Sequence, residues 1–435
     1  MGFIAAQSSF VSTVWGWSVL FLGLYFILIR RNEINQAGIF AAYMMGLEIV
    51  LRMVGANVLW EFGKYSIITF FIFALIIEKG KDLRISILIF IYIMGFIPSI
   101  LLLPMDQIDE WRQNISFNLS GPLSLFMSYL YFKDRSITKA NLSSLFRAIS
   151  LPLISMITII VFRMPSIDDL TFGTEANYQM SGGYGPNQVS SALGLIITLI
   201  ALGKILRFSI FGKDIVDYIM LMVCSTISLL TFARGGFLTS ILSIFSTWLI
   251  TLNNRSRRQY RFGAFFFFLM ILIITWNIIS DFTSGKISDR YSGIINFNQN
   301  GELINESNRI KIMTIDLEIF WDNFLVGVGP GRATEMRADY GYVHTVAAHS
   351  EFTRALAEHG VFGALGVLCL FFLSYGQYAI CKNHNKYITV CFTIMAILTM
   401  LHSAMRLSMP GFIFGLAFLR IIDIEKPSLP YPIKH

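Results

Sequence analysis

Charged residues are scarce in this sequence. Only 14% of the 435 residues carry a charge, against roughly 25% in an ordinary soluble domain. In contrast, 55% of the residues are hydrophobic, and Phe alone occurs 39 times. A soluble core has no use for so much apolar surface, whereas a lipid bilayer does. The composition therefore excludes a soluble domain or a nucleic-acid-binding protein and indicates an integral membrane protein.

Cysteine is scarce as well. The four cysteines are Cys224, Cys369, Cys381 and Cys391, and three of them fall inside apolar stretches. Their spacing matches neither a set of metal ligands nor a disulfide framework. We therefore expect no metal site and no disulfide scaffold.

Apolar stretches long enough to cross a bilayer recur along the chain. A span needs about 20 residues, and hydropathy predicts about thirteen spans. They lie at roughly 10–29, 37–57, 65–78, 85–104, 118–132, 148–164, 188–203, 215–232, 236–252, 263–280, 356–379, 387–402 and 408–421. The predicted fold class is an all-α integral membrane protein with about 12–14 transmembrane helices. The first span lacks the basic region of a cleaved signal peptide, so we expect it to be retained.

The second span is the least clearly apolar of the predicted spans. It contains Glu48 and Arg52, whose i,i+4 spacing places them on one face of a helix, where they could neutralise each other. Basic residues otherwise gather in alternate short loops, such as 79–84 and 255–261. The positive-inside rule then puts the C-terminus in the cytoplasm and the N-terminus outside.

Three parts of the chain follow from this alternation. Residues 1–280 hold about ten spans and a smaller outer loop at about 165–187, residues 281–354 form a large outer loop, and residues 355–435 hold the last spans and a short cytoplasmic tail. Long loops in compact proteins are usually functional. We therefore expect the chemistry to be in the large outer loop.

The large outer loop contains a helix-like pattern. Apolar residues recur at helical spacing from Ile310 to Phe324, which predicts a helix that starts near Ser307. Arg309 would lie in its first turn, where a cation opposes the helix dipole. Free backbone N–H groups and a guanidinium at such a place suit an anion.

A Gly- and Pro-rich turn, VGVGPGR, ends this predicted helix and places Arg332 among exposed backbone amides. A second helix is expected from His349, in HSEFTRALAEHGVFG, and it leads into the span at 356. His344 and His349 would lie just above the membrane. Histidine is the usual general base near neutral pH, because its unperturbed pKa is about 6.5.

Other polar residues converge on the same side. Arg234, in TFARGGF, lies between two spans, and a tight turn would explain Gly235 and Gly236 but not the arginine. Asn187 begins a span and could cap its helix. Arginines at a membrane boundary, such as Arg163, usually extend toward headgroups. Several cations and a candidate base at one membrane face nevertheless suit a lipid-attached anion, and a diphosphate fits because arginine binds it in a bidentate manner.

These motifs together resemble a known family. The run from Arg309 through VGVGPGR to HSEFTRALAEHGVFG resembles the shared signature of the bacterial O-antigen ligase and O-antigen polymerase superfamily. TFARGG resembles the small-Arg-Gly element of those proteins, and GYGPN resembles their Pro-Asn element. The motif-bearing part covers about residues 180–365. The sequence departs from the ligase pattern at Ser350, where ligases often have Asn.

The resemblance implies a membrane glycosyltransferase of the GT-C type that needs no metal or other cofactor. Its donor would be a glycan on undecaprenyl diphosphate, used at the periplasmic face of the bacterial inner membrane. By motif, Arg234 and Arg309 would stabilise the diphosphate leaving group, and His349 would deprotonate the acceptor hydroxyl. The further candidates for substrate binding are Arg332, His344, Asn187 and Arg163.

Three functions stay open on the sequence. A polymerase would join lipid-linked repeat units, a ligase would transfer finished glycan to lipid A-core, and a flippase or transporter would do no covalent chemistry. About thirteen spans, rather than the twelve expected of ligases, favour the polymerase. A transporter should carry charges at mid-membrane depth, where only Glu48 and Arg52 are found. The expected partners are the lipid-linked donor and acceptor and membrane lipids, with a chain-length regulator as a further candidate and no nucleic acid.

Overall fold

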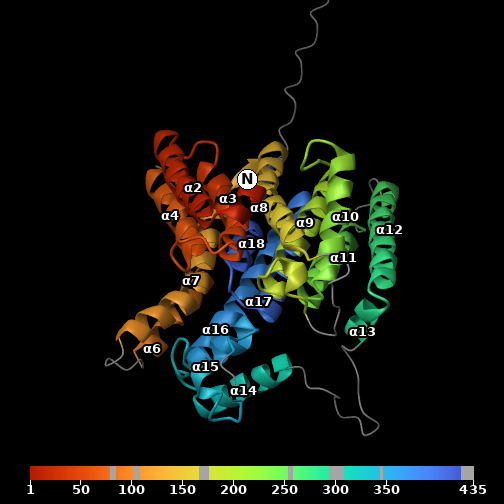
Figure 1. The fold of residues 1–435 in the computed structure, drawn as a ribbon. Coiled ribbons are helices and arrows are strands. Elements are labelled where there is room, and N and C mark those ends of the chain that lie inside the picture. The colour runs from red at the N-terminus through yellow and green to blue at the C-terminus, as the bar shows by residue number, and fades with distance from the viewer. Residues whose placement is uncertain are drawn as a thin grey trace, which may run out of the picture.

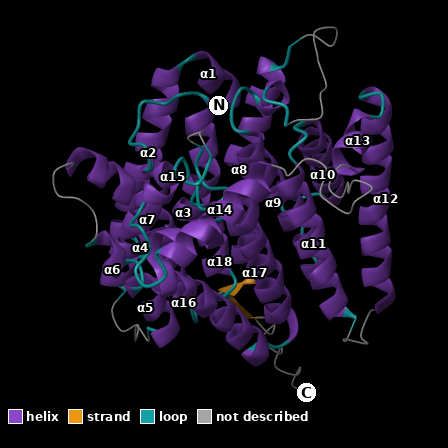
Figure 2. Cartoon of the chain, turned by 90° about the horizontal axis from the view of Figure 1, so that it is seen from below, coloured by secondary structure: helices purple, strands orange, loops and turns teal. Residues whose placement is uncertain are grey.

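The computed structural model describes residues 1–78, 85–101, 108–165, 176–252, 258–292, 308–342 and 346–422. This part of the chain is almost entirely helical (Figures 1 and 2). Its strands are one short parallel pair, β1 (Ser136–Thr138) and β2 (Arg420–Ile422). The predicted all-α membrane protein is therefore confirmed.

Each predicted span coincides with a helix or a pair of short helices. These are α2 (Ser9–Ile29), α3 (Gln36–Met53), α4 (Phe62–Ile77), α5 (Ile87–Met94) with α6 (Ile97–Ile100), α7 (Ile108–Phe132), α8 (Lys139–Arg163), α9 (Pro186–Leu206), α10 (Asp214–Leu230), α11 (Arg234–Thr251), α12 (Arg258–Phe282), α16 (Glu351–Ile380), α17 (Asn383–Ser403) and α18 (Met409–Leu416). Among the described residues, six helices are long and apolar enough to cross a membrane, namely α2, α8, α9, α12, α16 and α17. The other helices are shorter or less apolar, so the full number of spans stays a prediction.

The last predicted span is shorter than expected. The helix there, α18, has eight residues and rises about 12 Å at 1.5 Å per residue, less than half of a hydrocarbon core of roughly 30 Å. All eight residues are buried, and the helix packs against α7 and α17. Its apolar sequence is therefore explained by burial inside the protein.

Helix α9 lies at the centre of the bundle. Nearly all of its residues are buried, and it packs against α10, α11 and α17. A helix that is apolar on every side is typical of such a position. Helix α12 stands at the edge of the bundle beside α10, on the right of Figure 1.

The large predicted loop forms short helices at one end of the bundle, at the bottom of Figure 1. These are α13 (Lys286–Ser292), α14 (Asn308–Asp322) and α15 (Arg332–Met336). A small separate apolar cluster, which includes Ile312, Ile319 and Ala357, joins α14 to the start of α16. The chain also forms α1 (Gly2–Gln7) and a 3-10 helix, Gln179–Ser181.

The glycine-rich turn after α14 docks onto a break in α16. Gly360 interrupts α16 with φ 59° and ψ −141°, which leaves nearby carbonyls without their helical partners. Those of Ala357 and Glu358 accept hydrogen bonds from the amides of Val328 (3.1 Å) and Gly329 (2.9 Å). This contact fixes α14 against the helix that follows His349.

Candidate functional site

Arg309 and Asn187 meet at this end of the bundle. Arg309 lies in the first turn of α14, and its Nη2 donates a hydrogen bond of 2.7 Å to Asn187 Oδ1. The predicted capping role of Asn187 is wrong. Helix α9 begins with Pro186 after Gly185, with no side-chain cap, and Asn187 instead accepts a bond from a segment far along the chain.

Arg234 is the first residue of α11, and its Nη1 donates to the backbone oxygen of Arg290 at 2.8 Å. Gly235 and Gly236 lie within this helix, so the prediction of a tight turn there is wrong. A Cβ on Gly235 would come within 2.2 Å of the His402 ring, and one on Gly236 within 2.2 Å of the Ser190 backbone. The two glycines therefore allow α9 and α17 to approach α11 closely.

The arginines form a cationic cluster, which we define as Arg234, Arg290, Arg309 and Arg406. Burial and the positive charges of Arg290, Arg234 and Arg406 together lower the pKa of Arg309 to about 10, because burial and like charges both disfavour the charged form. Among the described residues, no carboxylate forms an ion pair with Arg234, Arg309 or Arg406. Three clustered cations that make no ion pair with a carboxylate in the described part of the chain are suited to binding an anion.

His349 lies beside the cationic cluster, just before α16. Its Nδ1 is buried and has no hydrogen-bond partner in the described part of the chain. Burial, together with the neighbouring Arg406, Arg309, Arg337 and His402, lowers the pKa of His349 to about 3. The imidazole is therefore neutral at physiological pH and can accept a proton. Ser350, which follows it, caps α16 by accepting from the amide of Thr353.

Arg406 is a member of the cluster that sequence reasoning missed. It lies between α17 and α18, and its Nη2 donates to the backbone oxygens of Ala347 (2.7 Å) and Ala348 (3.0 Å). No motif marks this residue, and a basic residue in a short outer loop is ordinarily explained by contact with headgroups. Its isolation between two predicted spans was the only available signal.

A buried ion pair holds the segment before His349. Arg337 is fully buried, its Nε lies 2.8 Å from Asp316 Oδ1, and its Nη1 donates to the oxygen of Val346 at 2.6 Å. Asp316 Oδ2 also accepts from the Thr353 hydroxyl at 3.0 Å. The pair therefore joins α14, the residues after α15 and the start of α16.

The structure does not bring Arg332 or Arg163 into the cluster. Gly331, next to Arg332, lies against Asn114 of α7, and Arg332 has no hydrogen bond or ion pair with cluster residues among those the structure describes. Arg163 donates to the backbone oxygens of Met53 (2.8 Å) and Gly182 (3.1 Å). His344 lies outside the described residues.

Metal and disulfide chemistry have no visible basis in the described ranges. No group of three or more His, Cys, Asp or Glu side chains there is placed to hold a metal ion. The four cysteines are buried and are not joined in disulfides. Metal independence stays a prediction.

These helices and the arginine cluster define a multi-pass membrane protein with a cationic site at one end of its bundle. A family model described as O-antigen ligase matches residues 219–368, a range that includes Arg234, Arg309 and His349. The match supports the resemblance to the O-antigen polymerase and ligase superfamily that the motifs indicate. A comparison with curated proteins finds no match.

Proposed function

We propose that the protein is a glycosyltransferase that takes a glycan from undecaprenyl diphosphate at the periplasmic face of the inner membrane, and that it acts as an O-antigen polymerase. The observation that carries this proposal is the meeting of Arg234, Arg309 and His349, from separate parts of the family-matched range, at one end of the bundle. Two guanidinium groups that make no ion pair with a carboxylate among the described residues suit the diphosphate. A neutral imidazole suits the role of base.

In the proposed reaction, a hydroxyl oxygen of the acceptor sugar attacks the anomeric carbon of the donor. The bond from that carbon to the diphosphate oxygen breaks, and its electron pair leaves with the lipid diphosphate. His349 takes the proton of the attacking hydroxyl. Arg234 and Arg309 stabilise the negative charge that develops on the leaving group. A single displacement of this kind inverts the anomeric configuration.

Binding of the donor would also activate the base. A base with a pKa of about 3 is weak, since efficient general bases have pKa values near the working pH. The negative diphosphate would offset the charges of Arg309 and Arg406, so the pKa of His349 would rise. Proton transfer from the acceptor therefore follows donor binding in this proposal.

The polymerase is favoured over the ligase by Ser350, where ligases often have Asn. The ligase is the second candidate, because the matching family model is described as O-antigen ligase. The number of spans no longer decides between them, because six described helices meet the length and composition criteria.

Purified full-length protein should be given lipid-linked repeat units extracted from the producing bacterium, without any core acceptor. Chain growth would support the polymerase and exclude a pure ligase. Transfer that occurs only after lipid A-core is added would identify the ligase. Absence of transfer under both conditions, from protein that elutes as a single folded species, would contradict the glycosyltransferase.

The residue roles need a cellular test. Arg309→Ala and His349→Ala should each abolish glycan assembly in cells that make stable protein. Lys311→Ala is a matched control, because Lys311 is exposed on the same helix as Arg309. If both site variants leave glycan assembly intact, the enzymatic role proposed for them is wrong.

A further inference from the structure

The link between α17 and α18, residues Ala404–Ser408, carries Arg406 into the cationic cluster. Ala404 has φ 51°, a left-handed conformation that a residue with a Cβ rarely adopts. Such a conformation persists when the surroundings hold the chain in place. Two buried carboxylates hold the link in place, one at each end.

Glu48 holds the end of the link that leads into α18. Its Oε2 accepts from both the amide (2.7 Å) and the hydroxyl (2.6 Å) of Ser408. Glu48 belongs to α3 and is 2% exposed. A charged acceptor that takes two hydrogen bonds in a buried place is a strong anchor.

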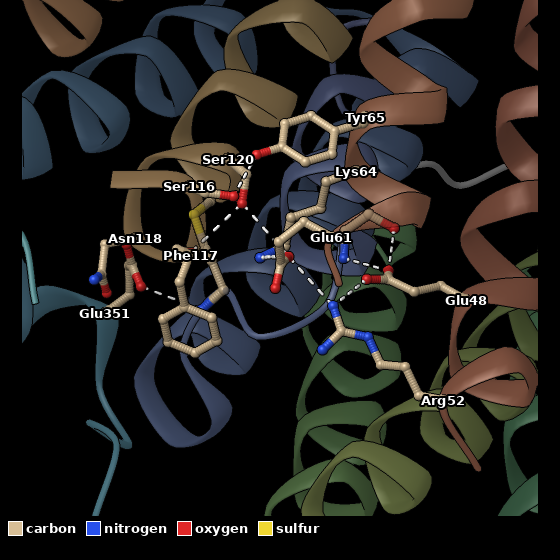
Figure 3. Close-up of polar contacts among 12 residues, drawn as sticks. Glu48, Arg52, Glu61, Lys64, Tyr65, Ser116, Phe117, Asn118, Ser120 and Glu351 are labelled. Carbon is tan, nitrogen blue, oxygen red and sulfur yellow. Dashed lines mark hydrogen bonds and ion pairs between the residues drawn. The ribbon is translucent and has the colours of Figure 1, made fainter. Parts of the chain in front are cut away.

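Glu48 is itself held by a buried charge cluster (Figure 3). Arg52 Nη2 lies 2.8 Å from Glu48 Oε1 and 3.2 Å from Glu61 Oε2. Lys64 Nζ lies 2.6 Å from the same Glu61 oxygen. The predicted i,i+4 pair is thus confirmed, and Glu61 and Lys64 complete a set of two acids and two bases. Pairing of this kind holds a buried carboxylate in one position.

Glu351 holds the other end of the link. Its Oε2 accepts from the amide of Met405 at 3.2 Å. Glu351 also pairs with Arg354, whose Nη1 donates to Asn118 Oδ1 at 2.8 Å. Figure 3 shows Glu351 beside Asn118 on the left and Glu48 on the right. The link is therefore fixed from both sides by groups that are already paired.

Arg406 extends from this fixed link to the segment before His349. Its Nη2 donates to the carbonyls of Ala347 and Ala348, so it restrains the two peptide units that lead into the histidine. The other charged or titratable groups around His349 are Arg309 of α14, Arg337 after α15 and His402 of α17. Arg406 makes the largest electrostatic contribution of the four.

We propose that Arg406 is a positioning residue for His349, and that Glu48, through Ser408, holds Arg406 in place. This inference rests on the proposed role of His349 as the base. It assigns the charge cluster buried among α3 and α4 a role in the reaction that acts through Ser408 and Arg406. A misplacement of about 1 Å in a catalytic group can lower the rate about 10²-fold.

Arg406→Gln and Arg406→Lys, made in the full-length protein, test the first part. With lipid-linked repeats as substrate, Arg406→Gln should lower kcat about 10²-fold with little change in KM. Arg406→Lys, which keeps one charged donor, should retain more activity. Arg147→Gln is the matched control, because Arg147 also donates to a backbone carbonyl, that of Ile210 at 2.8 Å, but has no contact with the residues before His349. Equal losses in Arg147→Gln and Arg406→Gln, or a raised KM with kcat unchanged, would overturn the positioning role.

A second readout needs no substrate. The pKa of His349 can be measured by NMR of histidine-labelled protein in lipid nanodiscs, with its signal assigned by loss in His349→Ala. Arg406→Gln should raise this pKa, whereas Arg406→Lys should change it less and Arg147→Gln should leave it unaltered. An unaltered pKa in Arg406→Gln would contradict the inference. A raised pKa in a protein that transfers no glycan would support the inference but refute the proposed function.

Glu48→Gln and Ser408→Ala test the second part. Ser408→Ala removes the 2.6 Å hydroxyl contact but keeps the backbone one, so it is the milder variant and serves if Glu48→Gln does not fold. Both variants should lower kcat, as Arg406→Gln does. The decrease should be smaller in Ser408→Ala than in Glu48→Gln. Wild-type kcat in folded Ser408→Ala and in folded Glu48→Gln would show that Glu48 does not position Arg406.

Discussion

The pH dependence of the reaction should reveal how His349 is used. In the protein without substrate, burial and neighbouring cations lower its pKa to about 3. Compared with an ordinary value of about 6.5, this corresponds to about 5 kcal/mol against protonation. The base form is the active one, so activity is lost only as the pH falls through the pKa. Because kcat/KM reports the free enzyme, it should not change between about pH 5 and pH 7.5 on account of His349.

The dependence of kcat on pH should differ, because kcat reports the complex with substrate. An opposite charge within about 4–6 Å shifts a pKa by about 1–3 units toward the charged form. The diphosphate should therefore raise the pKa of His349 to between about 4 and 6, and kcat should begin to fall in that range. The acid limb of kcat is thus expected at a higher pH than the acid limb of kcat/KM.

Initial rates of chain growth with extracted lipid-linked repeats, measured from pH 4.5 to pH 8, would show whether kcat falls toward acid pH while kcat/KM stays level. Arg309→Gln provides a comparison, because loss of one nearby cation should raise the kcat/KM limb. The reasoning is refuted if kcat/KM of the wild-type protein falls tenfold per pH unit below a pKa near 6.5. That result would mean that the environment of His349 does not disfavour its charged form. The same lowered pKa predicts that the folded state loses stability as the pH falls below 6.5, because only the unfolded chain then takes up the proton.

Three other substitutions test the surroundings of the site. Arg337→Met removes the ion-pair partner of the buried Asp316 and should lower the free energy of unfolding by about 3–5 kcal/mol. The double variant Arg337→Met, Asp316→Leu should regain part of the lost stability in thermal unfolding. If the double variant regains no stability, the loss does not come from the broken ion pair. Gly327→Ala should cost about 1–3 kcal/mol, because φ is 73° and the added Cβ would lie 2.4 Å from the backbone of Glu358; an unchanged melting temperature would contradict this close contact. Arg309→Gln should lower kcat about 10²–10³-fold in the chain-growth assay, and a loss confined to KM would show that its role is in binding only.

Local features of the large loop could be predicted from the sequence. Helical spacing predicted a helix beginning near Ser307, and α14 begins at Asn308. The glycine-rich run predicted its end, and the helix after His349 was also expected. These predictions depend on neighbouring residues alone, which is why periodicity and glycine were sufficient.

Contacts between distant segments could not be predicted in this way. The pairing of Gly235 with His402 and of Asn187 with Arg309 depends on how helices pack, and neither leaves a local pattern. The same holds for Glu61, which lies between two predicted spans in the sequence but is completely buried in an ion cluster. Arg309, Arg234 and His349 could be proposed from the sequence because motifs mark them, and their roles stay predictions.

The hydrogen bond between Glu48 and Ser408 joins residues 360 positions apart, which has a consequence for biosynthesis. Glu48 enters the membrane long before the ribosome has made Ser408. Its side chain therefore needs another hydrogen-bonding or charged partner while the rest of the chain is synthesised. Arg52, one helical turn away, is inserted together with Glu48 and can pair with it until Ser408 has been synthesised. The reactive site can be assembled only when the last helix has been inserted. A nascent chain that stalls before that point would therefore lack the Ser408 contact that holds the link carrying Arg406.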